Sequence, residues 1–198
     1  MLYHASSVEG IEVLQPRIAD NGMPLIYFSR KRENVLVYLV NAVERYCRET
    51  GFVHEGPYAK WGPYGFGKDG RLELSEYYPN ALEKVYKGAS SYIYCVDDVV
   101  DSGFQVQIPE VVTSSVPVPV SKVEFVPDAY EAILEAERNG LITIVRYGQP
   151  GPGFMEWLEK TIMAQYAGAE DRPEYRHFLR GNFPDFDLGK TIGKSSVV

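Results

Sequence analysis

Short apolar runs, each closed by turn-forming or hydroxyl residues, recur through the first 147 residues and limit what this chain can fold into. Runs of four to eight residues rich in β-branched and aromatic side chains predict β-strands. The clearest lie at residues 2–6, 25–29 and 91–96. Further extended segments are expected at 12–14, 71–78, 110–113, 116–126 and 141–147.

Helical periodicity alternates with these runs. Residues 31–49 carry apolar side chains at spacings of three and four, which places those side chains on one face of a helix. Ser29 is the expected N-cap and Gly51 the expected terminator of this helix. Shorter helices are predicted at residues 80–86 and 129–139. Strands mixed with helices in this way predict an α+β fold with a mixed sheet.

Two stretches rich in glycine and proline suggest how the chain is divided. The first, at about residues 52–70, also holds many aromatic side chains, so we interpret it as a structured insertion. The second, at residues 148–153, reads as a linker. We therefore predict an α+β domain over residues 1–147, followed over residues 148–198 by the linker and C-terminal helices that pack back on the body.

Composition excludes several classes of protein. The net charge of −7 and the pI near 5.1 argue against broad binding to nucleic acid or to anionic membranes. No run of about 18 apolar residues and no signal pattern occurs, which predicts a cytoplasmic protein that does not span a membrane. Cys47 and Cys95 lack metal-binding spacing, so we expect both to be reduced and unpaired. The three histidines lie far apart, so no metal site is predicted.

Two rings capable of chemistry lie in the first two strong strand runs. His4 and Tyr27 each precede small hydroxyl residues, Ser6 and Ser29, that end their runs. Side chains at strand ends are often presented to ligands by a rigid scaffold. We expect the two strands to lie side by side, with both rings facing one cleft. The alternative is that His4 is a satisfied core histidine and Tyr27 a packing aromatic.

The order of three motifs resembles the ADP-ribosyltransferase fold, and most closely the small rifampin ADP-ribosyltransferase-like group. The motifs are Tyr-His-Ala-Ser at residues 3–6, Ile-Tyr-Phe-Ser at 26–29 followed by a helix, and Tyr-Ile-Tyr at 92–94. The likeness covers roughly residues 1–130 in separated patches. It implies NAD as the substrate and a nucleotide-binding cleft.

The resemblance also implies roles for individual residues. His4 would hydrogen-bond the ribose next to the nicotinamide, and Tyr27 would stack on the nicotinamide ring, to which an aromatic face is suited. Ala5, Ser6 and Ser29 would complete the contacts to NAD. The family has a glycine at the position of Ala5. The side chain of Ala5 leaves less room between the backbone and NAD.

The catalytic acid of the family has two candidates here. Asp101 follows the Tyr-Ile-Tyr strand at about the expected distance, whereas Glu110 begins a later strand. A carboxylate beside the reacting ribose would stabilise its developing positive charge. Either residue could instead be an ordinary surface carboxylate.

Three functions remain open at this stage. The first is an NAD-dependent ADP-ribosyltransferase acting on an unknown acceptor, which could be a small molecule, a protein or a base. The second is a non-catalytic module that binds a nucleotide or a protein on the same fold. The third is a hydrolase with His4 as general base, which ranks last because no Gly-x-Ser-x-Gly motif occurs.

Overall fold

The largest sheet brings together strands from both ends of the first 130 residues. The computed structural model describes residues 1–18 and 22–188, and its fold is α+β. The main path of this sheet runs β10 (Lys122–Val126), β7 (Ser91–Val96), β1 (Leu2–Ser6), β4 (Pro24–Ser29) and β3 (Arg17–Ile18), and β8 (Val111–Ser114) pairs with β4. β1 is antiparallel to both β7 and β4, so the two predicted strands do lie side by side.

Two smaller sheets complete the β-structure. One has the order β11 (Ile142–Val145), β6 (Leu72–Ser75) and β5 (Tyr64–Phe66), with β11 parallel to β6. The other pairs β2 (Val13–Leu14) with β9 (Val118–Pro119). β3 is antiparallel to the start of β4, with Arg17 opposite Leu25 and Ile18 opposite Pro24.

The single helix expected over residues 31–49 is wrong. The segment forms a 3-10 helix, η1 (Arg32–Tyr38), and then a separate α-helix, α1 (Ala42–Thr50). Asn41 interrupts the periodic pattern, because its side chain accepts hydrogen bonds from Val43 N and Glu44 N and thereby starts a new helix. Ser29 Oγ accepts from Lys31 N in a local turn instead of capping the helix. Gly51 ends α1 in the left-handed conformation, as expected.

The other predicted helices are present with small changes at their ends. They are α2 (Ala81–Tyr86), α3 (Ala129–Arg138), α4 (Phe154–Ala167) and α5 (Pro173–Asn182). The Asp128 side chain accepts from Tyr130 N and Glu131 N and so fixes the start of α3. Helix α5 continues to Asn182, and the next residue, Phe183, is buried against other aromatic rings. Residues 189–198 lie outside the described part.

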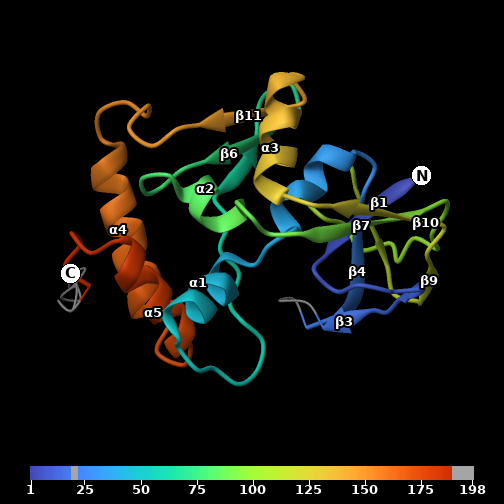
Figure 1. Cartoon of the computed structure of the whole chain (residues 1–198), viewed down its shortest axis with the longest axis horizontal. Helices are drawn as coiled ribbons and strands as arrows, with labels where there is room; N and C mark the ends of the chain where they lie inside the picture. Colours follow the sequence, from blue (N-terminus) through green and yellow to red (C-terminus); the bar gives the residue numbers. More distant parts are fainter. Residues whose placement is uncertain (19–21, 189–198) are drawn as a thin grey trace, which may run out of the picture.

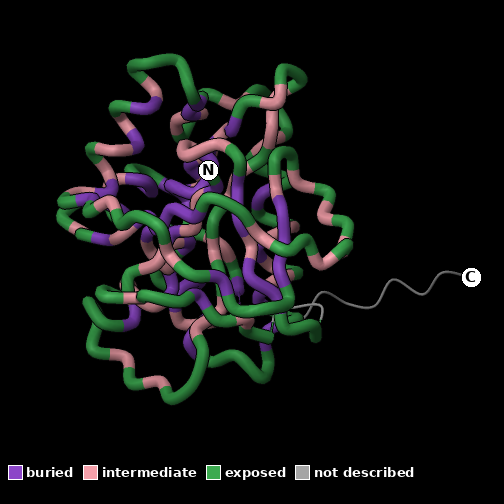
Figure 2. Tube along the Cα trace, turned by 90° about the vertical axis from the view of Figure 1, so that its right-hand side faces the viewer, coloured by how far each residue is buried: buried purple, intermediate pink, exposed green. Residues whose placement is uncertain are grey.

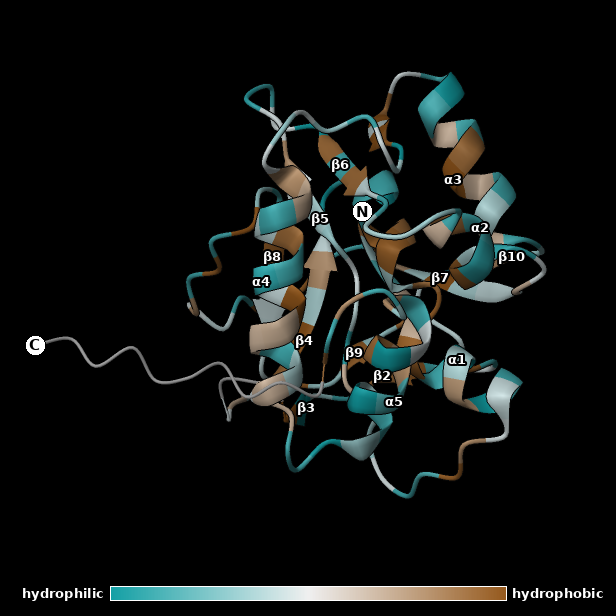
Figure 3. Ribbon diagram, turned by 90° about the vertical axis from the view of Figure 1, so that its left-hand side faces the viewer, coloured by the Kyte–Doolittle hydropathy of each residue, from teal (hydrophilic) through white to brown (hydrophobic). Residues whose placement is uncertain are grey.

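The C-terminal helices share a hydrophobic core with the body. In Figure 1 the largest sheet lies on one side of the molecule, and α4 and α5 lie on the other. Leu158 and Ile162 of α4 and Leu179 of α5 belong to the same buried cluster as Val43 of α1 and Ile93 of β7. Figure 2 shows buried stretches of the chain in the interior and exposed loops around them, and Figure 3 shows α4 carrying both hydrophobic and hydrophilic residues.

Two expectations from composition can be compared with the structure. Cys47 and Cys95 are both free and buried, which confirms that they are not bonded to each other. Within residues 1–18 and 22–188, none of the helices combines the length and apolar character that crossing a membrane requires.

Candidate functional site at the β1–β4 junction

His4 lies in the middle of β1, where the pairing with β4 is short. The register between these strands joins Tyr3 to Ser29, whereas β1 pairs with β7 along its whole length. One position beyond that pair, the His4 Nδ1–H donates to the carbonyl oxygen of Tyr27 at 2.9 Å. A carbonyl only accepts, so this bond fixes the tautomer. The Nε2 atom of a neutral His4 is therefore left with a lone pair.

The environment of His4 favours its neutral form. Burial lowers the pKa of His4, the hydrogen bond to Tyr27 opposes that shift, and the positive charge of Arg17 lowers the pKa further. Arg17 is exposed on β3 and forms no ion pair with any residue of the described part. His4 can thus accept a hydrogen bond near neutral pH, close to a guanidinium that forms no ion pair with the described residues.

The expectation that His4 and Tyr27 face one cleft is wrong. Antiparallel partners share a face of a sheet, and successive residues of a strand alternate faces. Tyr3 and Ser29 are partners, so Tyr27 lies on their face and His4 lies on the other. The His4 ring instead contacts Phe28, with 5.9 Å between ring centroids. The cause is a shift of one residue between the two motifs, which sequence spacing does not show.

The remaining predicted NAD contacts are divided between the same two faces. Ala5 and Ser29 are buried and share the face of Tyr27. Ser6 is half-buried on the His4 face, paired with Tyr92 of β7. The structure therefore gathers these residues at one strand junction without placing them on one surface.

Asp101 lies in a segment that is tied to β8. Its carboxylate accepts from Gly103 N at 2.8 Å, which closes a local turn. The next residue, Ser102, donates its N–H to Thr113 O and shares a hydroxyl contact with Thr113. The Asp101 side chain is exposed, and its one hydrogen bond serves its own turn.

Glu110 is hydrogen-bonded directly to the chain just after β4. Its carbonyl accepts from Arg30 N at 2.8 Å, just beyond the pairing of Ser29 with Val111. Two strand spacings separate β8 from β1, roughly 10 Å. Glu110 has φ of 65°, and Asn80 is the other non-glycine residue with positive φ in the described part. Such backbone strain is often found at functional positions, so the geometry favours Glu110 over Asp101.

A third carboxylate near β1 was missed by the sequence reasoning. Glu124 of β10 pairs with Ile93, which in turn pairs with Ala5, so Glu124 and Ala5 share a face. The Arg32 guanidinium grips both carboxylate oxygens of Glu124 and lowers its pKa. This ion pair occupies both carboxylate oxygens of Glu124 and connects η1 to β10. The extended segment expected at residues 116–126 includes this strand, but its sequence did not indicate that Glu124 would pair with Arg32.

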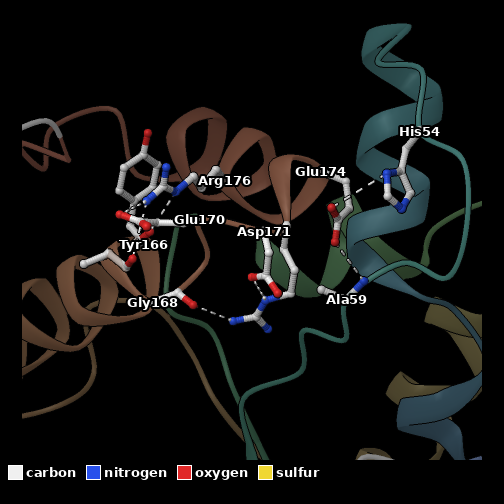
Figure 4. A network of polar contacts seen from close by, with 10 residues as sticks. His54, Ala59, Tyr166, Gly168, Glu170, Asp171, Glu174 and Arg176 are labelled. Carbon is white, nitrogen blue, oxygen red and sulfur yellow. Dashed lines mark hydrogen bonds and ion pairs between the residues drawn. The ribbon is translucent and has the colours of Figure 1, made fainter.

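A buried polar network lies beneath the aromatic insertion, well along the chain from β1. Glu174 of α5 is 2% exposed, and its Oε1 accepts from Ala59 N at 3.3 Å. Its Oε2 has no hydrogen-bond partner among the described residues and lies 3.8 Å from His54 Nδ1. Figure 4 shows the two side chains facing each other. The His54 Nε2–H donates to Pro57 O. This network anchors the insertion to α5, and no motif in the sequence pointed to it.

Cavities and metal-ligand groups give no further support to the β1–β4 junction. Three cavities have volumes of about 20, 180 and 260 Å³. Their lining residues all fall between 37 and 86 or between 147 and 186, so none of the three is lined by His4 or Tyr27. Among residues 1–18 and 22–188, no three His, Cys, Asp or Glu side chains form a group that could hold a metal ion.

Comparisons of the chain with protein-family models, with curated proteins and with solved structures found no match. We therefore infer function from the residues and their geometry.

Proposed function

We propose that the chain binds NAD at the β1–β4 junction and transfers ADP-ribose to an acceptor. The observation that carries the proposal is the state of His4. Its Nδ1–H is engaged by the Tyr27 carbonyl and its pKa is lowered, so Nε2 is available as an acceptor. A ribose hydroxyl needs such an acceptor, and this is the role that the motif resemblance implies for His4.

Of the two rings, only His4 is assigned a contact with NAD, because Tyr27 lies on the opposite face of the sheet. The recorded pairing of β1 with β4 is confined to Tyr3 and Ser29, and His4 bridges to β4 through its side chain. In this proposal the ribose next to the nicotinamide meets His4 on the face that His4 shares with Phe28. Arg17 supplies positive charge for the pyrophosphate, as expected for a guanidinium without an ion-pair partner in the described part.

The proposed reaction needs one carboxylate from the protein and one nucleophile, which is the acceptor. The bond between the ribose C1′ and the nicotinamide nitrogen breaks, and nicotinamide leaves with the bonding electrons. The acceptor then bonds to C1′ and loses its proton. A carboxylate stabilises the positive charge that develops on the ribose, and we assign this role to Glu110, with Asp101 as the alternative.

Calorimetric titration with NAD tests the binding step. The His4→Gln variant keeps an N–H donor for the Tyr27 carbonyl but loses the imidazole acceptor, so we expect affinity to fall about tenfold. His177→Gln is the matched control, because His177 lies on α5 and stacks on Phe52. Equal affinity of the His4 variant and wild type for NAD would remove His4 from the site.

Release of nicotinamide tests the chemical step. Glu110→Gln should lower turnover while leaving NAD affinity nearly unchanged, because the charge acts in the transition state. Asp101→Asn, made in parallel, should keep wild-type turnover. The opposite pattern would exchange the roles of the two residues.

A non-catalytic NAD-binding module is the second candidate. It is favoured by the side chain of Asp101, which closes its own turn, and by the exposure of Glu110. Binding of NAD without release of nicotinamide would support this candidate over the transferase, and absence of NAD binding would contradict both.

A further inference from the structure

A groove outside the β1–β4 junction runs between α1, α2 and the end of α5. It consists of two cavities of about 180 and 260 Å³ that share the lining residues Tyr78, Lys84, Gly181 and Asn182. The larger cavity is smaller than a typical site for a drug-sized ligand. It therefore suits a molecule of the size of one amino acid.

Two opposite charges, on Lys84 and Asp185, line the larger cavity. The Lys84 ammonium lies 5.4 Å from the centroid of the Tyr78 ring. Within the described residues, neither Lys84 nor Asp185 forms an ion pair, and the two do not pair with each other. A ligand bearing both a negative and a positive group could satisfy both at once.

The charges in the smaller cavity are already used. Arg45 donates to Glu49 Oε1 at 2.7 Å, to Val85 O at 3.1 Å and to Lys87 O at 2.8 Å. Arg45 and Glu49 therefore neutralise each other and fasten α1 to the end of α2. The charge available to a ligand is concentrated at Lys84 and Asp185.

The walls of the larger cavity are aromatic. Tyr77 and Tyr78 line it from the segment before α2, and Phe183 and Phe186 line it from the turn after α5. The rings of Phe183 and Phe186 are stacked, with centroids 5.5 Å apart. Faces and edges of this kind favour a further aromatic ring.

We propose that this groove binds a free aromatic α-amino acid. The carboxylate of the ligand meets Lys84, its ammonium meets Asp185, and its ring packs between Tyr77 and Phe183. This site is independent of the proposed NAD site, since neither His4 nor Tyr27 lines it.

Calorimetric titration of the full chain with three related molecules tests the proposal. L-phenylalanine carries both charges, 3-phenylpropionate lacks the ammonium, and phenethylamine lacks the carboxylate. We expect L-phenylalanine to bind most tightly. Lys84→Met should weaken L-phenylalanine and 3-phenylpropionate about fivefold and leave phenethylamine unchanged, as for the loss of one exposed charge pair. Asp185→Asn should weaken L-phenylalanine and phenethylamine and spare 3-phenylpropionate.

Lys87→Met is the matched control. Lys87 belongs to the same end of α2 but pairs with Glu83 at 2.6 Å and does not line the groove. We expect this variant to bind all three molecules as wild type does. The proposal is overturned if wild type binds none of them, or if Lys84→Met and Lys87→Met have equal effects.

Discussion

At the scale of single residues, His4 shows how one hydrogen bond defines the chemistry of a side chain. The Tyr27 carbonyl fixes its tautomer, and burial lowers its pKa. The position of His4 in a strand could be predicted from the sequence. Its face could not, because the register between β1 and β4 depends on pairing and not on spacing.

His4 should make the stability of the protein depend on pH. Its pKa is lower in the folded state than the ordinary value of 6.5, so the unfolded chain binds the proton more readily. Stability attributable to His4 is complete above pH 6.5 and falls as the pH drops toward the folded pKa. Urea unfolding between pH 5 and 7.5 should show a smaller loss at low pH for His4→Gln than for wild type. Parallel curves for the two proteins would contradict this reading.

At the scale of elements, contacts between distant segments decide where helices and loops are held. α1 and α5 meet where Gly181 faces Tyr46, and a Cβ atom added at Gly181 would lie 1.6 Å from the Tyr46 hydroxyl oxygen. The aromatic insertion is held by Glu174 of α5. Neither contact has a signal in local sequence, since each joins residues more than 100 positions apart.

Replacement of Gly181 should destabilise the protein despite the helical setting. Gly→Ala inside a helix ordinarily adds about 1 kcal/mol of stability. Here the clash with Tyr46 should outweigh that gain, and we expect a net loss of about 1–3 kcal/mol in urea unfolding. In a Tyr46→Ala background the same change should become neutral or stabilising. A stabilising effect in wild type would show that α1 and α5 do not pack in this way.

Glu174 should tolerate glutamine better than alanine. Glu174→Ala leaves the Ala59 N–H without its acceptor, and we expect a loss of about 1–3 kcal/mol and faster proteolysis within residues 52–63. Glu174→Gln keeps an oxygen for Ala59 and adds an N–H donor for His54 Nδ1, so stability near wild type is expected. Equal losses in the two variants would indicate that the negative charge, and not the hydrogen bonds, holds the insertion.

At the scale of the whole molecule, the body and the C-terminal helices share one hydrophobic cluster. Leu158 of α4 is fully buried in the same cluster as Val43 and Ile93. The linker at residues 148–153 therefore joins parts that are packed together.

Leu158→Ala should lower the stability of the whole chain in a single step. Loss of a buried leucine side chain costs about 2–5 kcal/mol, and because the cluster is shared we expect one cooperative transition in differential scanning calorimetry. Trp157→Ala, next to it on α4 and 47% exposed, is the control and should cost less. Two separate transitions in the Leu158 variant would show that the C-terminal helices unfold independently.

The sequence by itself determined most of the segments that become strands and helices, although it did not indicate β3, β5 or the 3-10 helix η1. Local signals suffice for this, because alternation, helical spacing and capping residues such as Asp128 and Gly51 act over a few positions. The break of the predicted helix at Asn41 is a local effect as well, because the Asn41 side chain caps α1, but the apolar periodicity alone does not show it. The opposite faces of His4 and Tyr27 and the burial of Glu174 under the insertion were decided by tertiary structure. Each depends on pairing or packing between segments far apart in the chain, which local spacing does not encode.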